Sequence, residues 1–182
     1  GFVTVSRVSA TCRYPSSFML IVSMNPCPCG NYGSDKECRC SETQRNRYLN
    51  KISGPLLDRL DIVVEMAGIA YKDIESKNKT ETSKDVRRRV NKARIVQYKR
   101  NGGNKANGMM KAQDIEKHIS LDGETKKLLE VAFERLGLSA RAYHRILKVS
   151  RTIADLSGSE DIKKEHIMEA LSYRGAEIKY WQ

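Results

Sequence analysis

The first third of the chain reads as short extended segments. Apolar and polar residues alternate over Phe2–Val8, as in a half-exposed strand, and Thr11–Pro15 predicts a second extended piece or the turn region of a hairpin. Residues 18–23 form a continuous apolar run that ends in Ser23, and Asp61–Met66, with Ile62-Val63-Val64 at its centre, reads as another buried strand. Such continuous runs are typical of strands that are buried on both faces of a parallel sheet. We therefore predict that residues 1–67 belong to an α/β core.

The remainder of the chain follows a helical period. Residues 68–82 are polar and lack periodicity, which predicts a linker between the α/β part and a helical domain at 83–182. Short helices are also expected at 42–51 and 56–60, before the linker. After it, the predicted helices cover residues 84–100, 109–118, 120–136, 139–156 and 163–174.

Only two or three strands of a parallel sheet are visible in this pattern. Such a sheet is incomplete, and the chain begins with residues that already read as a strand. We therefore expect a truncated α/β core followed by an all-α bundle, cut from a longer protein.

The chain is strongly basic. Its 33 Lys and Arg residues exceed its 22 Asp and Glu residues, which gives a net charge of +11. This balance favours a polyanionic partner, namely nucleic acid, nucleotide phosphates or an acidic membrane surface, although it also serves solubility. Residues 84–105 hold nine Lys or Arg and one acid, and Arg87, Arg88 and Lys92 are candidate contacts to nucleic-acid phosphates. The alternative, which the sequence supports equally well, is that these residues form only a solvated helix face.

No segment predicts a membrane anchor or an export signal. No apolar run approaches the roughly 20 residues that a spanning helix needs, and the amino end lacks a basic region followed by an apolar stretch. We expect a cytoplasmic protein, where thiols stay reduced.

Four of the five cysteines lie within a short loop. Cys27, Cys29, Cys38 and Cys40 follow the pattern C-x-C, eight residues, C-x-C. Four thiolates can surround a tetrahedral zinc ion, although the usual spacing within each pair is wider, so free cysteines or disulfides are the alternatives. The zinc would be structural, because four protein ligands leave no open position for a substrate. Cys12 is most simply a small core residue.

Three polar residues stand where a nucleotide could be bound. Asn25 follows the apolar run 18–23, Arg59 lies just before the run 61–66, and Arg141 lies in the first turn of a predicted helix. Each has a simpler interpretation: a turn former before Pro26, a surface ion pair and a solvated helix start. The chain contains no Gly-rich phosphate loop ending in Gly-Lys-Ser/Thr and no acidic pair after an apolar strand.

Longer strings of sequence resemble a known family. The chain is similar to the magnesium-chelatase-like branch of the AAA+ ATPases, and within it to the competence-related ComM/YifB family. The strings that carry this resemblance are Met24-Asn-Pro-Cys-Pro-Cys-Gly30, Cys38-Arg-Cys40, Ile52-Ser-Gly-Pro-Leu-Leu-Asp-Arg-Leu-Asp61, Gly137-Leu-Ser-Ala-Arg-Ala-Tyr-His-Arg-Ile-Leu147 and Arg151-Thr-Ile-Ala-Asp-Leu156.

The resemblance implies roles for single residues. Asn25 matches sensor 1, which orients the hydrolytic water, and Arg59 matches the arginine finger offered to the adjacent subunit. Arg141 matches sensor 2, which lies in the helical lid and touches the γ-phosphate of its own subunit's nucleotide. The hairpin before Phe18 resembles the pre-sensor hairpin, which can point into the pore of related ring motors.

The resemblance also implies what the chain lacks. The family's phosphate-binding loop and magnesium-binding acids precede the matched region, so ATP and magnesium are expected only in the full-length protein. The isolated chain should be inactive.

Three functions are compatible with these features. The first is part of a hexameric ATPase that works on DNA as a ring motor. The second is the ATPase subunit of a metal-chelatase complex, against which the four-cysteine loop argues. The third is a non-enzymatic, zinc-stabilised DNA-binding module, in which Asn25, Arg59 and Arg141 would match by coincidence.

Overall fold

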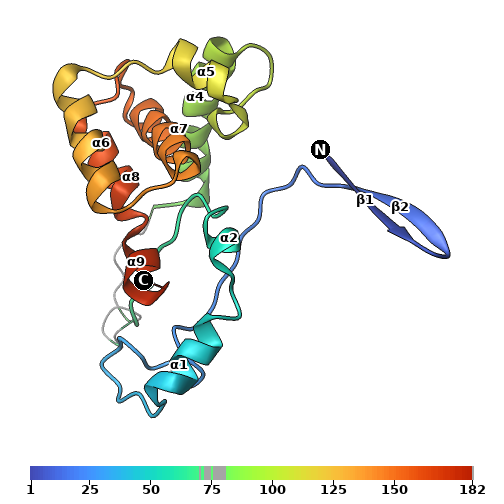
Figure 1. The fold of residues 1–182 in the computed structure, drawn as a ribbon. Coiled ribbons are helices and arrows are strands. Elements are labelled where there is room, and N and C mark those ends of the chain that lie inside the picture. Colours follow the sequence, from blue (N-terminus) through green and yellow to red (C-terminus); the bar gives the residue numbers. More distant parts are fainter. Residues whose placement is uncertain (70, 72–74, 76–80, 182) are drawn as a thin grey trace. The chain divides into compact units, whose positions relative to one another are not determined.

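The structure is a computed structural model that describes residues 1–69, 71, 75 and 81–181. It divides into two compact units, Gly1–Arg45 and Asn46–Gln182. The predicted linker, residues 68–82, lies in part outside the described residues. The described elements are two strands and a larger number of helices (Figure 1), which confirms the expected fold class of a truncated α/β part with a helical part.

The first unit opens with a β-hairpin. Strands β1 (Phe2–Arg7) and β2 (Ala10–Pro15) pair antiparallel, with Phe2 opposite Pro15 and Arg7 opposite Ala10. The alternating pattern therefore describes a hairpin whose two strands are exposed along their whole length. Cys12 lies on β2 and is exposed, so its interpretation as a core residue was wrong.

The two segments that were predicted as buried strands do not form strands. Residues 18–23 are extended and exposed, with 81% of Ile21 accessible, and residues 61–66 carry no strand assignment. In the second run the amide of Val63 donates instead to the carbonyl of Tyr173, at 3.0 Å. A buried parallel strand needs neighbouring strands on both sides, and within the described ranges neither run has one. The prediction of buried strands at these positions was therefore wrong for this chain.

The predicted helices are all present. Helix α1 (Glu42–Leu49) begins with a capping box, in which the amide of Gln44 donates to Ser41 Oγ at 3.3 Å and the amide of Ser41 donates to Gln44 Oε1 at 3.0 Å. The other helices are α2 (Gly54–Leu57), α4 (Ser83–Asn101), η1 (Asn107–Met109), α5 (Ala112–His118), α6 (Gly123–Arg135), α7 (Ala140–Ser157), α8 (Lys164–Ser172) and α9 (Gly175–Trp181). Helix α9 was not anticipated from the sequence. None of the described helices is both long enough and apolar enough to cross a membrane.

Short polar side chains set the starts of the main helices. The side chain of Thr82 accepts from the amide of Asp85 at 3.2 Å, so Thr82 caps α4. Asp122 caps α6 in the same way, and Ser139 caps α7. Helix α7 ends at Gly158, whose φ of 75° is the left-handed conformation that glycine adopts without strain.

Helix α7 is the centre of the second unit. Its apolar face, which includes Ile146, Leu147 and Ala154, packs with Leu129 of α6 and Ile167 of α8 in one buried cluster. A polar network joins α7 to α4 and η1: the buried carboxylate of Asp155 accepts hydrogen bonds from Arg100, Asn107 and Arg151. The apolar cluster and the network together hold α7 in a fixed orientation.

Candidate functional site

The first candidate site is the cysteine cluster, which consists of Cys27, Cys29, Cys38 and Cys40. All four Sγ atoms lie within 4.8 Å of one another. The Cys27 and Cys29 sulfurs are 3.4 Å apart, and each lies 3.7 Å from the sulfur of Cys38. Four sulfurs placed tetrahedrally around zinc at about 2.3 Å lie about 3.8 Å apart, so the cluster has nearly the spacing that the ion requires. The structure holds all four as free thiols rather than disulfides.

Tight turns bring the two cysteine pairs together. The amide of Gly30 donates to the carbonyl of Cys27 at 3.0 Å, and Gly30 has a φ of 81° that other residues rarely adopt. Arg45 donates to the carbonyl of Cys40 at 2.7 Å and lies over the ring of Tyr32. The loop is therefore bound to the first turn of α1, which keeps the second cysteine pair beside the first.

Backbone amides already stabilise negative charge on this cluster. The amides of Asn31 and Arg39 hydrogen-bond to the Cys29 sulfur and lower the pKa of that thiol to about 6. Burial raises the pKa of Cys27, but amide hydrogen bonds, chiefly from Tyr32, outweigh it and the pKa is lowered. Burial raises the pKa of the Cys40 thiol to about 11, and the neighbouring Cys29 contributes to the rise. Thiolates supported by backbone donors are what a bound zinc ion needs around it.

Asn25 immediately precedes this cluster. Asn25 is exposed, and its side chain lies over Gly30, where a Cβ atom would be 3.5 Å from Asn25 Nδ2. Asn25 belongs to the first unit, whereas Arg59 and Arg141 belong to the second. The structure therefore brings Asn25 to the cysteine cluster and does not relate it to the two arginines.

The second candidate site is a pocket that contains both predicted arginines. Arg59 follows α2 and Arg141 lies in the first turn of α7, and both side chains line one open pocket of about 480 Å³ in the second unit. Arg59 also donates a hydrogen bond to the carbonyl of Pro55, in the short helix α2 that precedes it. We call this the arginine pocket. Its lining also includes Asp58, Asp61, His144, Arg145 and Lys148.

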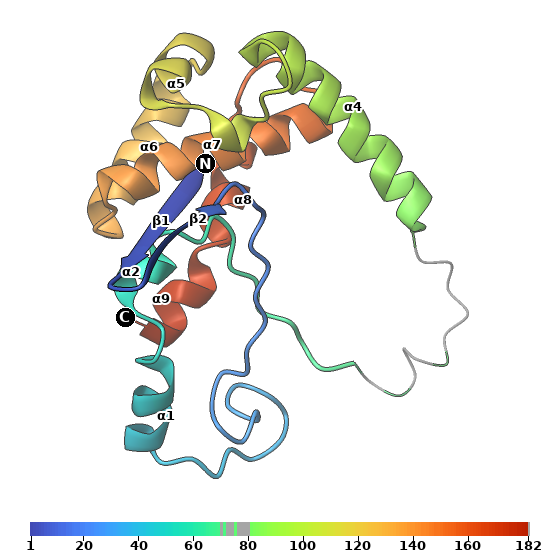
Figure 2. The ribbon, with the colours of Figure 1, turned by 90° about the vertical axis from the view of Figure 1, so that its right-hand side faces the viewer.

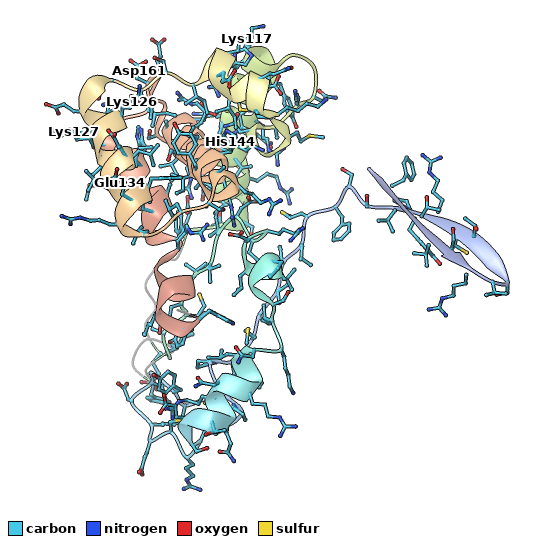
Figure 3. The ribbon with its side chains drawn as sticks, viewed as in Figure 1. Lys117, Lys126, Lys127, Glu134, His144 and Asp161 are labelled. Atoms are coloured by element: carbon cyan, nitrogen blue, oxygen red, sulfur yellow. The ribbon has the colours of Figure 1, made fainter. Side chains whose placement is uncertain are left out.

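The basic side of the arginine pocket is one face of α7. Arg141, His144, Arg145 and Lys148 are spaced i, i+3, i+4 and i+7, which places them along one face of a helix. Figure 3 shows His144 on this helix. Of these four residues the sequence pattern singled out Arg141, although the helical spacing of the other three from Arg141 was an available signal. Cations clustered at the positive end of a helix favour a bound anion.

The third candidate feature is the basic helix α4. Figure 2 shows its first turns extending away from α7, and Arg87 and Lys92 are exposed there. Arg88 is also exposed but pairs with Asp85 at 3.1 Å. The three predicted phosphate contacts therefore lie on an accessible segment, with Arg88 partly neutralised.

Two models of one protein family together match most of the chain. Residues 1–74 match the family model of magnesium chelatase, subunit ChlI, and residues 80–174 match the model of its C-terminal part. The chain therefore belongs to the magnesium-chelatase-like family, as the motifs indicated.

Individual relatives are also similar over nearly the whole chain. The competence protein ComM of Haemophilus influenzae is 43% identical over 175 residues, covering 96% of this chain and 34% of the relative. The uncharacterized protein YifB of Escherichia coli is 41% identical over 178 residues, with the same coverage of each chain. An uncharacterized protein of Mycobacterium tuberculosis is 32% identical over 176 residues, covering 96% of this chain and 35% of the relative. The chain thus spans about a third of the length of these curated relatives.

Proposed function

We propose that this chain is the carboxyl-terminal part of a hexameric AAA+ ATPase that acts on DNA in the cytoplasm. One observation carries the nucleotide-binding part of this proposal: Arg59 and Arg141, from separate elements, line one pocket. Two guanidinium groups that converge on one space suit the terminal phosphates of ATP, because arginine binds phosphate oxygens through a planar pair of donors. Asn25 serves as sensor 1 and orients the hydrolytic water.

The pocket that Arg59 and Arg141 share indicates which subunit's nucleotide Arg141 contacts. The family resemblance implies that Arg59 contacts the nucleotide of the adjacent subunit. It implies that Arg141 contacts the nucleotide of its own subunit. Because both side chains line one pocket, we propose that they contact the same nucleotide, the one held by the adjacent subunit. Charge developing on the transferred phosphoryl group is then stabilised by two cations from one chain.

The isolated chain is expected to hydrolyse no ATP, because its sequence contains neither a Gly-rich phosphate loop nor the acids that hold magnesium. The measurement is phosphate release from ATP and magnesium at high protein concentration. Arg141→Ala is the control for contaminating ATPases, whose turnover it leaves unchanged. Turnover that disappears in Arg141→Ala would contradict the proposal.

DNA is the proposed substrate of the complete motor. The net charge of +11 and the exposed basic turns of α4 support a polyanionic partner. The printed name of the Haemophilus influenzae relative, a competence protein, agrees with work on DNA. DNA-stimulated ATP hydrolysis by the longer protein tests this role. A chelatase-type ATPase, the alternative that the family name offers, would show no such stimulation.

Removing the charges of α4 is expected to weaken DNA binding. The triple variant Arg87→Ala, Arg88→Ala, Lys92→Ala should bind all sequences more weakly, and the slope of log K against log salt should become shallower by up to about 0.9 for each phosphate that the protein no longer neutralises. Fluorescence anisotropy at several salt concentrations measures both. The matched control is Lys126→Ala, Lys127→Ala on α6, whose two side chains are exposed on another helix (Figure 3).

The outcome also separates the motor from a simple DNA-binding module. An equal weakening in the α6 control would show that only net charge matters and would remove the assignment to α4. Tight, salt-dependent binding by this chain alone, without DNA-stimulated hydrolysis by the longer protein, would favour the zinc-stabilised module instead.

A further inference from the structure

A buried arginine connects the two arginines of the arginine pocket. Arg145 lies one helical turn after Arg141 on α7 and is only 6% exposed. Its Nη1 donates to the carbonyl of Leu60 and lies 3.4 Å from the carbonyl of Leu57. These two carbonyls stand on either side of Arg59 in the sequence. The Arg145 guanidinium therefore holds the backbone around Arg59 to the helix that carries Arg141.

Arg145 also lies near the acids that flank Arg59. Its Nη2 is 3.7 Å from Asp58 Oδ1, and its Nε is 4.0 Å from Asp61 Oδ1. Asp58 is approached a second time by Arg174, whose Nη2 lies 4.0 Å away. Asp58 and Asp61 flank Arg59 in the sequence, and Arg145 offsets part of their negative charge, so the exposed Arg59 guanidinium can receive an external anion.

A buried arginine at this position is not explained by packing. Burying a cation costs free energy unless the cation is paired and hydrogen-bonded, and an apolar side chain of similar volume often packs as well or better. An apolar residue would, however, leave the carbonyls of Leu57 and Leu60 without this donor at the end of a short helix.

We propose that Arg145 is a positioning residue, which fixes residues 57–61 against α7 so that Arg59 and Arg141 face one polyphosphate. This proposal rests on the nucleotide-binding role that we propose for the arginine pocket. Arg145 does not touch the phosphate itself; it acts through the backbone and charges around Arg59.

The test measures tripolyphosphate binding and amide exchange on the same chain. Arg145→Gln should weaken binding of millimolar tripolyphosphate by about tenfold, because Arg59 is then no longer held toward the pocket. It should also accelerate hydrogen exchange of the amides of residues 57–61, while the amides of α7 and α8 keep their protection. Arg145→Lys retains the charge and should recover part of both properties. Arg141→Gln, the matched control, should weaken binding without changing exchange.

The outcomes separate this inference from the function on which it rests. If Arg59→Ala and Arg141→Gln leave tripolyphosphate binding unchanged, the nucleotide-binding role of the arginine pocket is wrong. If those variants weaken binding but Arg145→Gln changes neither binding nor exchange at residues 57–61, only the positioning role is wrong. Faster exchange throughout α7 and α8 in Arg145→Gln would also overturn it, because Arg145 would then stabilise the whole fold.

Discussion

Cys27→Ser is expected to abolish stoichiometric zinc binding by this chain. Cys27 is fully buried at the centre of the cysteine cluster, and its sulfur lies 3.4 Å from that of Cys29 and 3.7 Å from that of Cys38. A structural zinc site contributes about 10–16 kcal/mol of apparent binding free energy in small domains, and a serine hydroxyl is a poor substitute for a thiolate. Elemental analysis of reduced protein should give one zinc per unaltered chain and almost none in the variant.

The chain provides a matched control for this measurement. Cys12→Ser removes a thiol that is exposed on β2 and lies outside the cysteine cluster, so it should retain its zinc. Less than about half a zinc ion per unaltered, reduced chain would remove the assignment of a zinc site with four thiolate ligands. So would equal zinc contents in Cys27→Ser and Cys12→Ser.

Metal removal should act locally. A chelator is expected to increase protease cleavage after Lys36 and Arg39, which lie in the loop that the cysteine cluster closes. Cleavage within the second unit should stay unchanged, because its apolar cluster contains none of these cysteines. Limited proteolysis with trypsin, followed by mass spectrometry, locates the cuts.

As the proposed arginine finger, Arg59 should be essential for the proposed ATP hydrolysis by the longer protein, and Arg59→Ala is expected to lower its kcat by about a thousandfold or more. Binding of ATP should change less, since the finger acts mainly on charge that develops in the transition state. Arg59→Lys should not restore activity, because an ammonium group lacks the planar pair of donors. The control is Arg135→Ala, an exposed arginine in the last turn of α6, outside the arginine pocket.

A mixing experiment tests whether Arg59 acts on the nucleotide of its own subunit or on that of the adjacent subunit. Subunits with Arg59→Ala can be combined with subunits whose phosphate-binding loop is disabled. Activity should return on mixing, because some interfaces then join an intact loop to an intact Arg59. The same experiment with Arg141→Ala tests whether both arginines serve one nucleotide. Recovery with Arg59→Ala but not with Arg141→Ala would contradict their shared role.

Local sequence predicted the helices and the two hairpin strands well, but it also predicted two buried strands that do not form. Helix α7 was expected from its period, its Ser139 cap and its terminal Gly158, all of which act within the segment itself. Helix α9 was missed, and its contacts lie far away in sequence: Trp181 donates to the carbonyl of Leu49, and Lys179 pairs with Glu65. Segments 18–23 and 61–66 were predicted to be strands because apolar residues tend to be buried. A strand also needs a neighbouring strand with which its backbone can pair.

The cysteine cluster was the part of the candidate sites that the sequence defined most fully. Its four cysteines lie within fourteen residues, and turns at Gly30 and Gly33 bring them together without help from distant segments. The arginine pocket was different. Arg59 and Arg141 were chosen as separate residues, and nothing in their spacing of more than eighty positions indicated that they line one pocket.

The sequence by itself therefore determined the family, the helical segments and the composition of the cysteine cluster, since each depends on short strings of residues. Only the tertiary structure placed Arg59 and Arg141 in the lining of one pocket, together with His144 and Lys148. It also showed the buried Arg145 that binds the backbone around Arg59. These relations depend on α7 packing against the segment after α2, and such contacts are set by the burial and hydrogen bonding of residues distant in sequence rather than by any local pattern.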